Sequence, residues 1–175
     1  MTKKHNIGLV LTLLIVIFLS SCRSSSKVLY NPKEVAYLSS QLSIPISNDD
    51  ENMALYVEAS RWLNVPYRYG GTDRRGLDCS ALTGILYRTV YDKPLERSSA
   101  GIAEKNIHKI SKNNLKTGDL VFFATGKNRK RISHVGVMLS DKHFIHASTS
   151  RGVIVSHLDE EYYRRTFVKA GRVKK

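Results

Sequence analysis

The cysteines and histidines of this 175-residue sequence are the side chains whose types and spacing best support chemistry. Only two cysteines occur, Cys22 and Cys79. If Cys22 carries a covalent modification other than a disulfide, Cys79 has no disulfide partner. A single unpaired cysteine in an exported protein suggests a free reactive thiol. The alternative is a buried cysteine that packs as a small apolar residue. A reactive thiol needs a base beside it, which a histidine can supply.

Two histidines are candidates for that base. His134 lies in an alternating segment, residues 133–139, and His146 lies in the next segment, twelve residues later. Strands of a sheet that contacts a helix start can bring one imidazole to a thiol, while a further polar group orients it. Gly136, on the predicted face of His134, is expected to leave room for the helix end. For each histidine alone, a surface or structural position is the alternative.

A zinc site is a second possibility, because four histidines fall between residues 134 and 157. His143 and His146 have opposite parity, so they point to opposite faces of a strand. Cys79 is the only cysteine after residue 22. The spacing therefore predicts no metal site.

The elements that position these residues are predicted from hydrophobic periodicity. Helices are expected over residues 51–64 and 78–90, with Asp78 as the N-cap of the second. Strands are expected at residues 119–123, 133–139, 143–147, 153–155 and 168–173. Helices followed by strands indicate an α+β domain with helices packed on an antiparallel sheet. Cys79 then lies in a first helical turn, where the helix dipole and a nearby histidine predict a thiol pKa below its usual ~8.5.

The N-terminus resembles an export signal. Lys3 and Lys4 precede an apolar run over residues 7–19, which is shorter than the ~20 residues of a membrane span and suits a signal peptide. The run ends in Leu19-Ser20-Ser21-Cys22, which resembles the bacterial lipobox, whose cysteine receives a diacylglycerol before cleavage. A plain signal peptide or an uncleaved anchor is the alternative.

Three regions follow from this pattern. Residues 1–21 are predicted to be a lipoprotein signal peptide. Residues 22–50, rich in Ser and Asn, are predicted to be the lipidated cysteine and a flexible linker, with a weak helical signal over residues 32–42. Residues 51–175 are predicted to be the folded domain.

The chain is strongly basic, with a formal net charge of +13, and residues 51–175 hold 23 Lys and Arg against 12 Asp and Glu. Basic chains often bind nucleic acid, but an export signal argues against that partner. Anionic cell-wall polymers or lipid headgroups remain. The basic run over residues 127–131 directly precedes the predicted strand of His134. It is either a solvated hairpin loop or a basic rim that docks anionic wall polymer.

Five motifs then occur in order. They are Pro66-Tyr67-Arg68-Tyr69-Gly70-Gly71, Gly76-Leu77-Asp78-Cys79-Ser80, Gly118-Asp119-Leu120-Val121-Phe122-Phe123, His134-Val135-Gly136-Val137 and Phe144-Ile145-His146-Ala147-Ser148. Together they resemble the NlpC family of papain-like cell-wall cysteine peptidases, over about residues 51–175. The resemblance implies a papain-like α+β fold and hydrolysis of amide bonds in peptidoglycan stem peptides, without a cofactor.

The resemblance also implies roles for single residues. Cys79 would be the nucleophile, His134 the general base, His146 the residue that holds the imidazole, and Tyr67 a helper of the oxyanion. The implied substrate-binding residues are Asp78, Ser80, Arg97 and Ser98. Three positions depart from the family pattern, Ala81, Glu96 and Ile102. None is a catalytic position, so the departures bear on substrate preference.

The sequence leaves several alternatives open. The same fold supports an amidase that cuts between glycan and peptide, an acyltransferase that uses the same thioester, or a non-catalytic wall-binding lipoprotein. The bond could join γ-D-glutamate or D-alanine to diaminopimelate. The oligomeric state is also open. Arg23 replaces the Asp that commonly retains lipoproteins in the inner membrane, which favours an outer-membrane anchor facing the periplasm.

Overall fold

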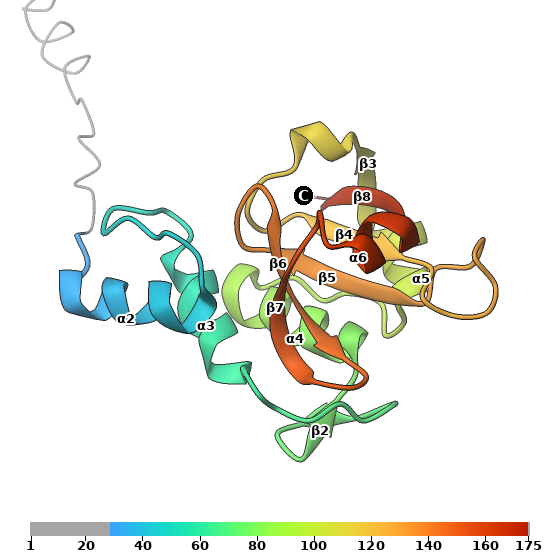
Figure 1. The fold of residues 1–175 in the computed structure, drawn as a ribbon, viewed down its shortest axis with the longest axis horizontal. Coiled ribbons are helices and arrows are strands. Elements are labelled where there is room, and N and C mark those ends of the chain that lie inside the picture. Colours follow the sequence, from blue (N-terminus) through green and yellow to red (C-terminus); the bar gives the residue numbers. More distant parts are fainter. Residues whose placement is uncertain (1–28, 175) are drawn as a thin grey trace, which may run out of the picture.

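The computed structural model describes residues 29–174 (Figure 1). The predicted signal peptide and Cys22 lie outside the described residues. The helical segments are α2 (Pro32–Leu42), α3 (Met53–Trp62), α4 (Cys79–Tyr91), α5 (Ser99–Gly101), the π-helical η1 (Ile102–Asn106), the 3-10 segment η2 (Lys112–Asn114) and α6 (Glu161–Thr166). The strands are β1 (Thr72–Asp73), β2 (Gly76–Leu77), β3 (Ile107–Ile110), β4 (Leu120–Phe123), β5 (His134–Met138), β6 (His143–Ser148), β7 (Gly152–His157) and β8 (Phe167–Val173). None of the described helices is both long and apolar enough to cross a membrane.

A six-stranded sheet in the order β3-β8-β4-β5-β6-β7 forms the centre of the fold, and all of its strand pairs are antiparallel. The short strands β1 and β2 form a separate hairpin. Helix α4 packs against β5 and β6, and α3 packs against α4 (Figure 1). The predicted α+β class is therefore confirmed, although β1, β2 and β3 were not predicted.

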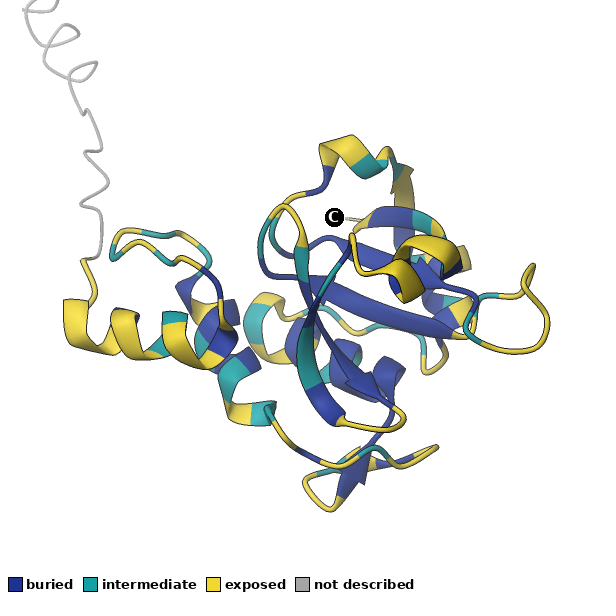
Figure 2. Cartoon of the chain, viewed as in Figure 1, coloured by how far each residue is buried: buried dark blue, intermediate teal, exposed yellow. Residues whose placement is uncertain are grey.

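Two apolar cores cover the two faces of the sheet. The larger core joins the helices to one face through residues such as Leu82 and Leu86 of α4 and Val135 and Val137 of β5. The smaller core lies on the other face and contains Phe123, Met138, Phe144 and Tyr163 among others. The buried residues of the strands are dark blue in Figure 2. Alternate side chains of the His134 segment therefore point into two different apolar cores, instead of one core and solvent.

Gly136 belongs to the face with the smaller core. A Cβ placed on Gly136 would lie 2.5 Å from Cδ2 of Phe144. Phe144 packs on the side of the sheet opposite α4. The prediction that Gly136 makes room for the helix end is therefore wrong, since the missing side chain makes room for Phe144.

Residues 32–50 are part of the folded domain. Asn31 caps α2 by accepting a hydrogen bond from Lys33 N at 3.0 Å, and Pro32 occupies the first helical turn. Val35, Leu42 and Ile44 are buried in the larger core. The flexible linker predicted for residues 22–50 is wrong over this part. The few apolar residues that dock α2 recur two helical turns apart, a sparse signal in a polar segment.

Candidate active site

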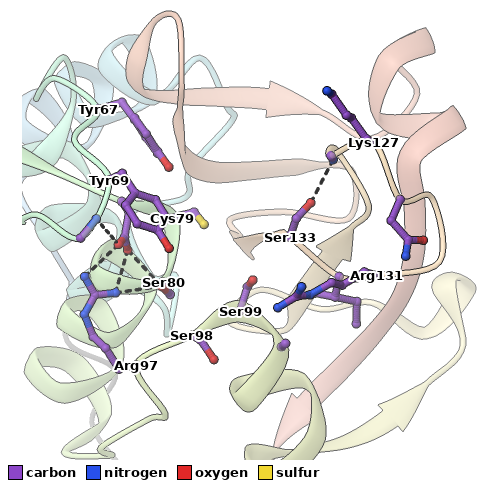
Figure 3. Close-up of a pocket in the computed structure, with 16 residues that line it drawn as sticks. Tyr67, Tyr69, Cys79, Ser80, Arg97, Ser98, Ser99, Lys127, Arg131 and Ser133 are labelled. Atoms are coloured by element: carbon purple, nitrogen blue, oxygen red, sulfur yellow. Dashed lines mark hydrogen bonds and ion pairs between the residues drawn. The ribbon is translucent and has the colours of Figure 1, made fainter.

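Cys79 is the first residue of α4 and has a free thiol. Its side chain is only 7% exposed, yet it lines a pocket of about 720 Å³. Figure 3 shows the sulfur directed into this pocket. The structure thus places the sequence's candidate nucleophile at a helix start, as predicted, with one side open to a ligand.

Burial raises the pKa of the Cys79 thiol to about 11. Hydrogen bonds from the backbone N–H groups of Val135 and Ser80 lower the pKa, but the loss of solvation outweighs them. The prediction of a thiol pKa below ~8.5 is therefore wrong for the resting protein. Backbone N–H groups at the helix start lower the thiol pKa as expected, but burial of the side chain raises it by more.

His134 and His146 form a buried chain of hydrogen bonds. His134 begins β5 and His146 lies in β6, and Nε2 of His134 is 2.9 Å from Nδ1 of His146. Beyond them, Nε2 of His146 is 3.2 Å from Ser156 Oγ and 3.0 Å from Tyr163 Oη. Val135, which follows His134, is one of the residues whose backbone N–H reaches the thiol. The two histidines predicted from the sequence are thus joined to each other, and His134 is the chain neighbour of a residue whose backbone N–H reaches the thiol.

This series of hydrogen bonds can hold His134 and His146 in defined tautomers. If Nε2 of His134 carries the proton, it donates to Nδ1 of His146, and Nε2 of His146 then donates to Ser156 or Tyr163. In that arrangement Nδ1 of His134 is unprotonated and free to accept a proton. The opposite arrangement would place a proton on Nδ1 and remove the base. Partners that accept a hydrogen bond from Nε2 of His146 therefore favour the arrangement in which His134 can act as a base.

Burial also keeps both imidazoles neutral. It lowers the pKa of His134 to about 4. Burial lowers the pKa of His146 well below its usual value, and the neighbouring His134 lowers it further. At neutral pH the site therefore holds a neutral thiol and two neutral imidazoles.

Asp78 joins the start of α4 to two loops. Its Oδ1 accepts hydrogen bonds from Ala81 N at 2.8 Å and from Ser80 Oγ and Arg97 Nη1, both at 2.9 Å. Its Oδ2 accepts from Gly70 N at 3.0 Å and from Arg97 Nη2 at 2.8 Å. Burial alone would raise the pKa of Asp78, but the hydrogen bonds from Arg97, Ala81 and Ser80 lower it overall. The predicted N-cap is confirmed, and the carboxylate has no oxygen left without a partner.

The other residues predicted for substrate binding gather around the same pocket. Arg97 also donates from Nη1 to Ser80 Oγ at 2.9 Å. Ser98 caps α5 by accepting a hydrogen bond from Gly101 N at 3.1 Å. Tyr67 lines the pocket with its phenol oxygen turned toward the sulfur of Cys79 (Figure 3). Burial raises the pKa of Tyr67, and the proximity of Cys79 adds to this effect, so the phenol stays protonated and can donate a hydrogen bond.

The loop between β4 and β5 forms the opposite wall of the pocket. Lys127, Asn128 and Arg131 line this wall (Figure 3). Part of the basic run over residues 127–131 therefore lines the same pocket as the thiol. Among residues 29–174, no group of three or more His, Cys, Asp or Glu side chains is arranged to hold a metal ion.

The sequence reasoning missed Ser156 and Tyr163. Ser156 lies in β7, whose register pairs it with Phe144, and Tyr163 lies in the short helix α6. Neither belongs to a motif quoted above. The one available signal is the parity of Ser156 in β7, which becomes informative only when the register of β6 and β7 is known.

Comparisons with known proteins show which chains are similar to this one. A family model described as the NlpC/P60 family matches residues 64–172. The chain is 41% identical over 115 residues to a probable endopeptidase NlpC homolog of Haemophilus influenzae. That match covers 65% of this chain and 58% of the relative, so it spans less than two thirds of that relative's length.

A second relative aligns over most of both chains. It is the murein DD-endopeptidase MepS/murein LD-carboxypeptidase of Escherichia coli K12, with 32% identity over 169 residues, 91% of this chain and 88% of the relative. Among solved structures, an NlpC/P60 family protein from Bacillus cereus superposes with a TM-score of 0.62 and 28% identity. It covers 75% of this chain and 42% of that protein.

Proposed function

The chain belongs to the NlpC/P60 family, and from this premise we propose that it is a cysteine endopeptidase that hydrolyses amide bonds in peptidoglycan stem peptides. The observation that carries the proposal is the Cys79 thiol, which lines a pocket and accepts a backbone N–H from the residue that follows His134, together with the hydrogen bond between His134 and His146. A nucleophile, a base and a group that orients the base are the parts that acyl transfer through a thioester requires.

The first half of the reaction forms the thioester. Nδ1 of His134 takes the thiol proton of Cys79 as the sulfur attacks the carbonyl carbon of the scissile amide. The carbonyl electrons move to oxygen, and backbone N–H groups at the start of α4, with the phenol of Tyr67, stabilise the oxyanion. Nδ1 then returns the proton to the amide nitrogen as the C–N bond breaks. The amine fragment leaves, and the acyl group stays on sulfur.

The second half releases the enzyme. Water attacks the thioester carbon while Nδ1 of His134 removes a proton from it. The C–S bond breaks, the sulfur regains its proton, and the product leaves as a carboxylic acid that ionises in solution. Because the resting thiol and imidazole are neutral, proton transfer accompanies attack in the first step instead of preceding it.

Of the two candidate bonds, we propose the D-alanyl-diaminopimelate crosslink. The relative that aligns over 88% of its own length is named a murein DD-endopeptidase, which supports this bond over the γ-D-glutamyl bond. We also propose that Asp78, Ser80, Arg97 and Ser98 shape the substrate side of the pocket. Since both oxygens of Asp78 are bonded within the protein, that carboxylate would act mainly by holding Arg97 and the helix start in place.

Digestion of purified cell-wall sacculi tests the function. Mass spectrometry of the products should show crosslinked muropeptide dimers converted to monomers by the protein, and no conversion by Cys79→Ala. Shortened stems would instead indicate the γ-D-glutamyl bond, released whole peptides an amidase, and adducts with added amines an acyltransferase. A Cys79→Ala protein that still digests sacculi would refute the cysteine mechanism.

We further propose that the protein is a lipoprotein of the cell envelope, anchored through Cys22 in the outer membrane and facing the periplasm. The lipobox resemblance at Leu19 to Cys22 supports this proposal. Stable anchoring needs more than one acyl chain, and lipoprotein modification supplies at least two. In cells, Cys22→Ala should leave an unprocessed precursor or a released protein. A processed variant that still fractionates with membranes would contradict the anchor.

A further inference from the structure

The pocket beside Cys79 has a basic wall that the proposed reaction does not use. Lys127 and Arg131 line it from the loop between β4 and β5, across the pocket from Tyr67 and Arg97 (Figure 3). In the same view the guanidinium of Arg131 extends from the loop into the pocket. Both residues are exposed, so their charges remain available to a ligand.

Neither charge is neutralised by the protein. None of the ion pairs within residues 29–174 includes Lys127 or Arg131. Asp78 is the one carboxylate among the residues that line the pocket, and its two oxygens are already bonded to Arg97 and to backbone N–H groups. The pocket therefore carries an excess positive charge on the wall that faces the thiol.

The loop that carries these cations is held by hydrogen bonds at its base and its turn. Ser133 Oγ accepts from Thr125 N at 2.9 Å and from Gly126 N at 3.2 Å. At the turn, the side chain of Asn128 accepts from Lys130 N at 2.9 Å, and its backbone carbonyl accepts from Arg131 N at 3.2 Å. A loop backbone fixed before binding lowers the entropy cost of using its side chains.

We infer that Lys127 and Arg131 form a carboxylate-binding subsite, which selects stem peptides with a free carboxylate close to the scissile amide over amidated ones. The inference rests on the proposed function and specifies its substrate class. Arginine binds carboxylates through two parallel N–H···O bonds, and lysine adds a compact point charge. Because both side chains are exposed, salt should screen the attraction.

Matched stem peptides test the subsite. One crosslinked peptide has free carboxylates, a second is amidated at D-glutamate, and a third is amidated at the diaminopimelate carboxylate. The wild-type protein should cleave at least one of the two amidated peptides about 10-fold more slowly in kcat/KM than the free acid. In the variant Lys127→Gln with Arg131→Gln, kcat/KM on the free acid should fall to its value on that slowly cleaved amidated peptide. Its rate on the amidated peptide should be nearly unchanged, which also shows that the variant is folded.

The same loop supplies a control of equal charge change. Arg129 and Lys130 are exposed but do not line the pocket, so Arg129→Gln with Lys130→Gln should retain the 10-fold preference. The subsite is overturned if the wild-type protein cleaves all three peptides equally, or if Lys127→Gln with Arg131→Gln loses the same factor on each. In both cases the peptidase proposal stands. A wild-type protein that cleaves none of the peptides overturns the peptidase proposal and the subsite with it.

Discussion

The partners of His146 offer a direct test of how the base is prepared. Tyr163→Phe removes one acceptor from Nε2 of His146, and Ser156→Ala removes the other. Phe at position 163 keeps the ring that packs against Phe123 and Phe144 at centroid distances of 5.3 and 4.9 Å. The single variants therefore change hydrogen bonding with little change in packing.

The expected magnitudes follow from what each variant leaves behind. After one substitution, Nε2–H of His146 still has the other partner, so the loss is about 0.5–1.5 kcal/mol, or ~2- to 10-fold in kcat. After both, a donor on a residue that is 1% exposed has no partner within the protein. That costs ~1–3 kcal/mol and favours the opposite tautomer, in which His134 cannot accept a proton. The double variant should then lose more in kcat than the two single losses multiplied together.

Steady-state kinetics on a soluble crosslinked peptide measure these losses. KM should change little, because neither Ser156 nor Tyr163 lines the pocket. Nitrogen NMR of the labelled imidazoles should show the tautomer of His146 change in the double variant. Ser156→Thr keeps a hydroxyl at this position and should retain most of the wild-type kcat, in contrast to Ser156→Ala. Ser148 is also buried but does not bond to His146, so Ser148→Ala should leave kcat unchanged. A double variant with unchanged kcat and unchanged tautomers would refute the reasoning.

Three further predictions concern protonation and packing. Iodoacetamide should label Cys79 slowly at neutral pH and faster toward pH 11, because burial raises the thiol pKa; fast labelling at pH 6 would contradict this. The pKa of histidine is ~6.5 in the unfolded chain, whereas burial lowers the pKa of His134 to about 4 in the folded protein. The contribution of neutral His134 to stability should therefore be complete above pH ~6.5 and be lost as the pH falls toward 4. Urea midpoints should follow that window, and a midpoint that is flat across it would count against buried neutral histidines. Gly136→Ala should cost ~1–3 kcal/mol in unfolding free energy by crowding Phe144, and an unchanged melting temperature would show that the core can adjust.

The positions predicted from the sequence were those set by local patterns. Asp78 and Cys79 were placed correctly because an N-cap followed by apolar residues at helical spacing defines a helix start within a few residues. His134 and His146 were placed on neighbouring strands because short turns and alternation define a hairpin. Both patterns are visible in a single stretch of chain.

The features that escaped prediction depend on distant parts of the chain. Ser156 and Tyr163 reach His146 only through the register of β6 with β7 and the docking of α6. The raised thiol pKa depends on how much protein surrounds Cys79, which no motif encodes. Likewise, docking of α2 on the core depends on Val35 and Leu42 meeting α3 and its neighbours, although the surrounding composition is polar.

The buried, un-ionised state of Cys79 has a consequence for the chemical durability of the protein. Oxidants such as peroxide attack the thiolate, and a thiol whose pKa is raised to about 11 presents very little thiolate at neutral pH. Residues 29–174 contain no second cysteine that could capture an oxidised sulfur as a disulfide. A low thiolate fraction therefore slows oxidation of the nucleophile, which matters most in an oxidising compartment. Burial keeps the Cys79 thiol protonated, so its proton must be removed during each turnover. The same burial slows oxidation of the sulfur between turnovers.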